Sequence, residues 1–228
     1  MNIKLLLTYE QNQTNNDSLH RIERTPRYDL ELKECINHWR KNAGILKDIE
    51  IIVHTDKPLD MDNVTVIVQP FEKKLKSKYG FVNVHESGLL AHKLYPNNTF
   101  IHIDLDMYLQ KELPLSLFEK DTIGVYSRID EAHQREKLFG DRLAETDFIV
   151  STSDIFYKKY FWFYNSVKKI CDNKNCDDYD VEEYVADFLI KSLNLDIFEN
   201  YEIGQGFRLN LDSPYFIHRH IYEDDYKL

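Results

Sequence analysis

Four short apolar segments in the first half of the chain have the pattern of buried strands. They span residues 3–7, 49–55, 64–68 and 99–103, and polar or turn residues bound each of them. Continuous apolar runs of this length, rich in β-branched residues, are typical of strands buried on both faces, as in a parallel sheet. Two further strands are expected over 122–127 and 147–151.

Helical patterns separate these strands. Between the first two, apolar residues recur at i, i+3, i+4 and i+7, namely Leu32, Cys35, Ile36 and Trp39. Asp29 can cap this helix and Gly44 can end it. A second helix is expected before the strand at 99–103, with Asn83 and Glu86 at capping-box spacing and Pro96 at its end. Two later helices are predicted at about 154–170 and 181–193. The β-α-β order favours an α/β protein with a parallel sheet and right-handed crossovers.

Composition narrows the class of protein. A chain of 228 residues is long enough for a sizeable core, and we expect one domain. Its 29 basic and 39 acidic residues give a net charge of −10, which argues against a nonspecific nucleic-acid binder. No segment approaches about 20 consecutive apolar residues, so we expect no transmembrane segment and a cytoplasmic protein. Three cysteines without a secretory signal are expected to be reduced thiols.

Two carboxylates directly follow the strand at 99–103, in the sequence Asp104-Leu105-Asp106. In an open α/β sheet, ligands bind beyond the carboxyl ends of the strands. Alternation along an extended segment would place both carboxylates on one side and turn Leu105 into the core. Two such oxygen ligands suit Mg²⁺ or Mn²⁺ bound to a diphosphate. The alternative is a pair of solvated acids at the end of a strand.

Several segments resemble the metal-dependent, nucleotide-sugar-using glycosyltransferases of the GT-A fold, particularly the small ones related to the glycogenin and bacterial galactosyltransferase family. They are "LLLTYE" at 5–10, "IIVHTD" at 51–56, "LYPNNTFIHIDLDMYLQKEL" at 94–113 and "PYFIHRH" at 214–220. "DFIVSTSDIF" at 147–156 is similar to the family's later "fNsGv" strand and turn, although its Asn and Gly are absent here.

The resemblance implies a GT-A-like, Rossmann-like fold, with a mostly parallel central sheet flanked by helices. Residues 1–228 would form a single glycosyltransferase domain, with a nucleotide-binding half at about 1–110 and an acceptor-side half at about 111–228. The implied reaction moves a sugar from a nucleoside diphosphate sugar, with UDP the expected nucleotide, to a hydroxyl of a glycan, protein or small-molecule acceptor. The resemblance leaves open the donor sugar, retention or inversion, and the oligomeric state.

The same resemblance implies a metal site made by distant parts of the chain. Asp106 would bind Mn²⁺ (or Mg²⁺) directly, and Asp104 would contact the metal or the ribose. A histidine near the C-terminus would complete the protein ligands. His218 ranks above His220 because it directly follows the apolar "YFI", and the alternative for either is a solvent-facing histidine. Imidazole beside two carboxylates favours Mn²⁺ over Mg²⁺.

Other residues have expected roles around the donor. Thr8 and Tyr9 end the first strand, where the family holds the base, and the Tyr9 ring could stack on it. Asp56 could accept a hydrogen bond from base or ribose, and its alternative role is in the turn before Lys57-Pro58. Lys78, in a lysine cluster that could equally be a solvated loop, would neutralise the diphosphate. Glu182 borders the apolar stripe of its helix and is the candidate catalytic carboxylate, needed as a base only if the enzyme inverts.

Two other functions fit the same motif. A phosphatase of the haloacid-dehalogenase type also has Asp-x-Asp after an apolar strand, but that motif normally opens the domain and continues with a small residue and threonine. Here the motif begins at position 104 and continues Met107-Tyr108. The second is a non-catalytic module that binds nucleotide-sugar or serves as a scaffold.

Overall fold

The structure is a computed structural model that describes residues 2–11, 27–71, 81–119, 121–126, 144–172, 178–198, 203–205, 214–219 and 221. Its first half contains β1 (Ile3–Tyr9), α1 (Tyr28–Asn42), β2 (Glu50–Thr55), β3 (Thr65–Val68), α2 (Phe81–Leu94), β4 (Thr99–Ile103) and β5 (Met107–Leu109). The second half contains β6 (Thr122–Tyr126), β7 (Ala144–Ser151), α4 (Ile155–Asp172), α5 (Asp178–Leu193), β8 (Asp196–Phe198), β9 (Ile203–Gln205) and β10 (Phe216–His218). Short 3-10 helices η1 (Gly44–Leu46) and η2 (Leu115–Phe118) complete the described elements.

Seven strands form one mostly parallel sheet in the order β3-β2-β1-β4-β7-β6-β8. Strands β3, β2, β1 and β4 are parallel neighbours, and β6 is parallel to β8. Strand β7 alone runs antiparallel to its neighbours β4 and β6 in this sheet. A smaller sheet has the order β5-β10-β9. The predicted α/β class and the mostly parallel central sheet flanked by helices are therefore confirmed.

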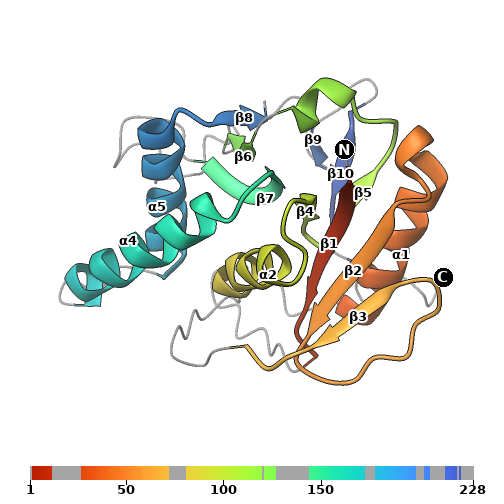
Figure 1. Cartoon of the computed structure of the whole chain (residues 1–228), viewed down its shortest axis with the longest axis horizontal. Helices are drawn as coiled ribbons and strands as arrows, with labels where there is room; N and C mark the ends of the chain where they lie inside the picture. The colour runs from red at the N-terminus through yellow and green to blue at the C-terminus, as the bar shows by residue number, and fades with distance from the viewer. Residues whose placement is uncertain are drawn as a thin grey trace.

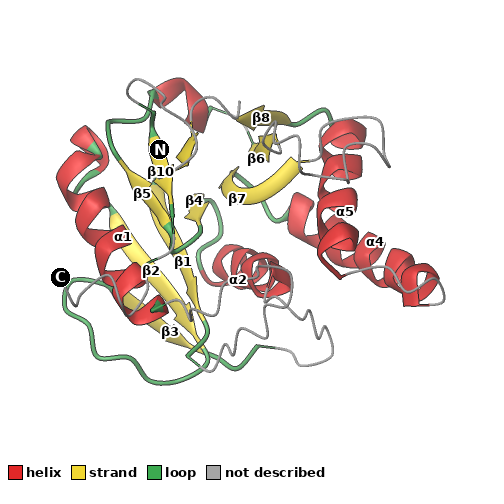
Figure 2. Cartoon of the chain, turned by 180° about the vertical axis from the view of Figure 1, so that it is seen from behind, coloured by secondary structure: helices red, strands yellow, loops and turns green. Residues whose placement is uncertain are grey.

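Helices cover both faces of the large sheet (Figure 1). On one face α1 packs through Leu32, Cys35 and Trp39 against the strands, and the apolar residues at i, i+3 and i+7 are thus its buried stripe. On the other face α2 lies against β1 and β4, and α4 and α5 pack on each other at the end of the molecule away from α1 (Figures 1 and 2). None of the described helices is both long and apolar enough to cross a membrane.

The ends of α1 follow the sequence prediction only in part. The helix ends at Asn42, and Gly44 lies just beyond its C-cap with a φ of +56°, as a glycine stop signal predicts. The predicted N-cap was wrong, because α1 begins at Tyr28 after Arg27 and Asp29 lies inside the first turn. There Asp29 accepts hydrogen bonds of 2.9 Å from the Arg27 guanidinium. The Arg27 hydrogen bonds are the main reason that the pKa of Asp29 is lowered.

The predicted capping box of α2 was also wrong. The helix begins at Phe81, so Asn83 lies inside it rather than at its N-cap. The Asn83 amide donates a 2.7 Å hydrogen bond to Glu10 Oε2, which follows β1. Asn83 therefore joins the start of α2 to the carboxyl end of β1.

Four buried histidines lie in α2 and in the strands of the large sheet. His54 Nδ1 is 2.7 Å from Ser87 Oγ, His92 Nε2 is 2.9 Å from Ser151 Oγ, and His102 Nε2 is 2.8 Å from Thr8 Oγ1. The fourth, His85, stacks on Tyr160 with 3.7 Å between ring centroids. Burial lowers the pKa of all four, to about 3 for His85 and His102, because a charged imidazolium would lose its hydration. The four rings are therefore neutral at pH 7.

Gly88 of α2 lies directly against the Tyr157 ring of α4. A Cβ atom added to Gly88 would lie 2.2 Å from Cζ of the buried Tyr157. Since that distance is far below van der Waals contact, only glycine fits at this position while the Tyr157 ring keeps its place. The Tyr157 hydroxyl reaches Ser151 Oγ at 3.3 Å, so the ring also contacts β7.

Candidate metal and nucleotide site

The structure brings Asp106 and His218 together across 112 positions of sequence. His218 Nε2 lies 2.8 Å from Asp106 Oδ2, and their side chains are 18% and 9% exposed. Two strand contacts hold the pair, since β5 and β10 are antiparallel with His218 opposite Met107, and the Arg219 N–H donates to the Asp106 carbonyl at 3.0 Å. The two residues expected to share a metal are thus hydrogen-bonded neighbours.

The backbone between Asp104 and Met107 is a turn rather than a continuing strand. Strand β4 ends at Ile103, and the Met107 N–H donates to the Asp104 carbonyl at 3.1 Å, the i to i+3 bond of a β-turn. Strand alternation therefore does not carry as far as Asp106, contrary to the reasoning from the sequence. Leu105 does pack, partly buried, against the core as expected.

Both carboxylates of the motif lie near the buried thiol of Cys35 in α1. Burial raises the pKa of Cys35, and the negative charges of Asp106 and Asp104 raise it further. Asp104 is half-buried, and its N–H donates to the Asp147 carbonyl at 3.0 Å. The turn that carries the two aspartates is thus fixed to β7 on one side and to β10 on the other.

A third carboxylate, which the sequence did not reveal, belongs to Asp147 of β7. The antiparallel register pairs Ile103 with Phe148, which places Asp147 beside Asp104 at the carboxyl end of β4. Asp147 Oδ2 lies 3.4 Å from His218 Nδ1. The signal that could have found it is the antiparallel direction of the strand expected at 147–151.

The oxygen and nitrogen atoms at this site would suit a divalent cation that takes most of its ligands from substrate and water. Among the described residues, no three His, Cys, Asp or Glu side chains form a complete metal-binding group. Asp106 and His218 nevertheless present an oxygen and a nitrogen 2.8 Å apart. Neighbouring ligands of an octahedral ion at about 2.1 Å are separated by about 3 Å. One carboxylate and one imidazole, with diphosphate oxygens, suit Mn²⁺ or Mg²⁺.

Thr8, Tyr9 and Asp56, which are predicted to contact the nucleotide, lie at the carboxyl ends of β1 and β2. These two strands are parallel neighbours. Thr8 Oγ1 contacts His102 Nε2, so its hydroxyl already has a partner. Asp56 Oδ1 accepts the Gln11 N–H at 2.8 Å and ties the segments after the two strands together, in agreement with its alternative role in a turn. The pKa of Tyr9 is raised by partial burial and by the charges of Asp29 and Asp56.

Glu10, which follows β1, places a further carboxylate beside the residues predicted to contact the nucleotide, although it was not itself predicted. Its Oε2 accepts the hydrogen bond from Asn83. Partial burial, with Asp56 nearby, raises its pKa. No periodicity or motif singles it out, because its setting depends on the packing of α2 against β1.

Three predicted residues cannot be compared with the structure. Lys78 and His220 lie outside the described residues. Glu182 belongs to α5, but its side chain is also outside the described part. The roles of Lys78 and Glu182, and the choice between His218 and His220 as ligand, remain predictions.

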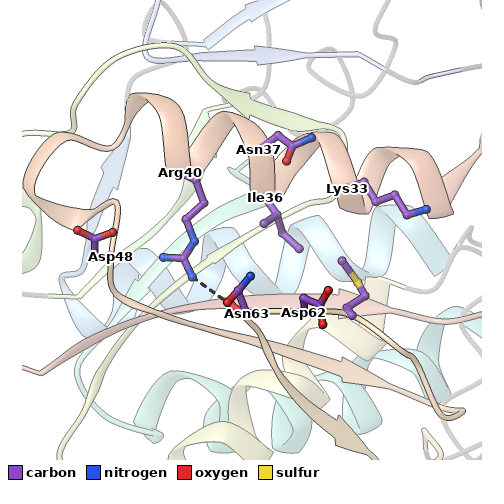
Figure 3. Close-up of a pocket in the computed structure, with 8 residues that line it drawn as sticks. Lys33, Ile36, Asn37, Arg40, Asp48, Asp62 and Asn63 are labelled. Atoms are coloured by element: carbon purple, nitrogen blue, oxygen red, sulfur yellow. Dashed lines mark hydrogen bonds between the residues drawn. The ribbon is translucent and has the colours of Figure 1, made fainter.

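A cavity of about 730 Å³ lies elsewhere, between α1 and the loop that joins β2 to β3 (Figure 3). Lys33, Ile36, Asn37 and Arg40 line it from α1, Asp48 from the turn before β2, and Met61, Asp62 and Asn63 from the loop between β2 and β3. The Arg40 guanidinium donates to the Asn63 carbonyl at 3.3 Å and to the Ile49 carbonyl at 2.9 Å. Arg40 therefore anchors the loop, and none of the predicted site residues lines this cavity.

Comparison of the chain with protein-family models and with curated proteins finds no match to either.

Proposed function

We propose that this protein is a metal-dependent glycosyltransferase with a GT-A-like fold. It transfers a sugar from a nucleoside diphosphate sugar, with UDP the favoured nucleotide, to an acceptor hydroxyl. The observation that carries the proposal is the 2.8 Å contact between Asp106 and His218, because the resemblance selected these two distant residues as ligands of one metal. The mostly parallel strands that end beside this contact are in accord with the proposal.

In this proposal the chain's own residues hold the donor at the carboxyl edge of the sheet. Asp106 Oδ2 and His218 Nε2 are the metal ligands, and Asp104, on the same turn, contacts the metal or the ribose. A bound Mn²⁺ or Mg²⁺ would supply positive charge to the leaving diphosphate. Tyr9 ends β1, the neighbour of β4, and Asp56 follows β2, the neighbour of β1; they are the proposed contacts of the base and ribose.

The reaction exchanges one bond at the anomeric carbon of the donor. The bond from this carbon to the phosphate oxygen breaks, and its electron pair leaves with the diphosphate. The acceptor oxygen forms the new bond, and its proton passes to a base. In an inverting course Glu182 is the proposed base, whereas in a retaining course the departing diphosphate oxygen can take the proton.

Thermal-shift titration with UDP, GDP and their sugars, with and without Mn²⁺, tests the proposal. UDP is expected to raise the melting temperature only when Mn²⁺ is present. Asp106→Asn should abolish this Mn²⁺-dependent shift, whereas Asp60→Asn, a matched change at an exposed aspartate, should keep it. No metal-dependent stabilisation by any nucleotide would refute the proposal.

A phosphatase assay distinguishes the proposed glycosyltransferase from a haloacid-dehalogenase-type phosphatase. Hydrolysis of p-nitrophenyl phosphate that survives His218→Ala but is lost in Asp104→Ala would favour the haloacid-dehalogenase type. The glycosyltransferase proposal expects no such hydrolysis. Nucleotide binding that is independent of metal and of Asp106 would instead favour a binding module.

A further inference from the structure

We propose that Asp147 is a positioning residue for the metal ligand His218. Its carboxylate accepts the Nδ1–H of His218 and thereby leaves the lone pair of Nε2 for the metal. This inference rests on the proposed function, since it assigns a role in the same metal site. It adds a residue that neither the sequence motif nor the resemblance selected.

The imidazole of His218 faces a different carboxylate at each nitrogen. Nε2 is 2.8 Å from Asp106 Oδ2, and Nδ1 is 3.4 Å from Asp147 Oδ2. Asp106 and Asp147 therefore lie at different edges of the ring. A metal bound to Nε2 lies at the Asp106 edge, so Asp147 supports the ring from the opposite edge.

Metal binding requires a particular tautomer of His218. A neutral imidazole carries one N–H, and the other nitrogen holds a lone pair. Without metal, an Nε2–H can donate to Asp106 across the 2.8 Å contact. When Nε2 binds a cation, the proton of the neutral ring must reside on Nδ1, which faces Asp147. The carboxylate of Asp147 thus stabilises the tautomer that can bind metal.

The backbone around Asp147 is fixed by the sheet. The Asp104 N–H donates to the Asp147 carbonyl at 3.0 Å, and Phe148 follows with its side chain fully buried in the core. The Phe148 ring lies 5.5 Å from that of Phe216, two residues before His218. Packing therefore sets the separation of β7 and β10, and with it the distance between the Asp147 carboxylate and the imidazole.

The structure places His218 Nδ1 and Asp147 Oδ2 at ion-pair distance, and burial would make a hydrogen bond between them effective. The side chains of His218 and Asp147 are only 18% and 15% exposed, so water competes weakly for the Nδ1–H. A carboxylate that accepts the second N–H of a metal-bound histidine fixes its orientation and raises its basicity as a ligand. Loss of such a partner typically weakens metal affinity about 10- to 100-fold.

Measurement of Mn²⁺ affinity tests the inference without an activity assay. Free Mn²⁺ is counted by electron paramagnetic resonance during titration in the presence of saturating UDP. Asp147→Asn and Asp147→Leu are both expected to bind Mn²⁺ about 10- to 100-fold more weakly than wild type, and Asp60→Asn should bind it equally well. Circular dichroism establishes that each variant is folded. If the leucine variant does not fold, the isosteric asparagine variant carries the test.

The tautomer of His218 supplies a second readout that a purely structural role would not change. In ¹⁵N spectra of wild type with Mg²⁺ and UDP, His218 is expected to be protonated at Nδ1 and not at Nε2. Wild-type Mn²⁺ affinity in either folded Asp147 variant would overturn the inference, and so would a protonated Nε2 in the metal complex. Absence of Mn²⁺ binding by the wild-type protein would instead refute the proposed function.

Discussion

Burial of His85 makes the stability of this protein depend on pH. The side chain is fully buried and its pKa is lowered to about 3, whereas an unfolded histidine has a pKa of about 6.5. Between these values the unfolded chain binds the proton and the native protein does not. The contribution of neutral His85 is therefore fully present above about pH 6.5 and is lost progressively as the pH falls toward 3.

The loss of stability at low pH can be calculated from how far burial lowers the pKa of His85. Each pH unit in this window changes the free energy of unfolding by about 1.4 kcal/mol for one histidine. Between pH 7 and pH 4.5, His85 alone is expected to remove about 2–3 kcal/mol of stability. Total stabilities of domains are about 5–15 kcal/mol, so this loss is large. The lowered pKa values of His54 and His92 act in the same direction.

Urea unfolding of His85→Phe at several pH values between 7 and 4.5 measures this contribution. Phenylalanine keeps an aromatic ring against Tyr160 but cannot titrate. The variant should therefore lose about 2–3 kcal/mol less than wild type over this range, whatever its stability at pH 7. Tyr160→Phe is the control, because it leaves His85 buried and should preserve the wild-type pH dependence. Equal pH dependence in His85→Phe and wild type would refute the reasoning.

Three further substitutions test the packing and the hydrogen bonds of the fold. Gly88→Ala places a methyl group against the Tyr157 ring and should lower the free energy of unfolding by about 1–3 kcal/mol in urea titrations; unchanged stability would mean that α2 and α4 can separate without cost. Trp39→Phe removes the buried 3.0 Å hydrogen bond from Trp39 Nε1 to the Leu46 carbonyl at the end of η1. It should lower the free energy of unfolding by about 1–3 kcal/mol in the same urea titrations. A loss near zero would contradict that hydrogen bond. Glu31→Ala leaves the buried Ile221 N–H without its 2.8 Å acceptor. Because residue 221 closely follows β10, which carries His218, the change should lower both the melting temperature and the Mn²⁺ affinity. Mn²⁺ affinity equal to wild type would show that the hydrogen bond from Ile221 to Glu31 does not position His218.

Local sequence patterns predicted the helices and strands well, because the buried face of each element gives its apolar residues a regular spacing along the chain. The strand expected at 99–103 is β4, and the stripe that includes Leu32 and Trp39 is the buried face of α1. Two capping predictions were wrong, at Asp29 and Asn83. Both side chains take partners other than a helix N-terminus, namely Arg27 and Glu10, and a capping pattern does not include such competing partners.

The candidate site could be predicted only where a motif marks it. Asp106 comes shortly after an apolar strand and His218 ends another, and the resemblance marks both residue types as metal ligands. Asp147 follows no motif and gains its position from the antiparallel insertion of β7 between β4 and β6. Strand direction depends on the long connections between elements and not on the alternation within a strand. Had this strand run parallel, Asp147 would lie at the opposite edge of the sheet.

The contact between Gly88 and Tyr157 limits how this protein can move around a substrate. Helix α2 belongs to the half of the chain proposed to bind the nucleotide, and α4 belongs to the half proposed to bind the acceptor. Because the Tyr157 ring occupies the space of a side chain at position 88, sliding or rotation of one helix on the other would break tight packing. A change in the separation of the proposed donor and acceptor sides that moved α2 against α4 would therefore cost packing energy at this contact.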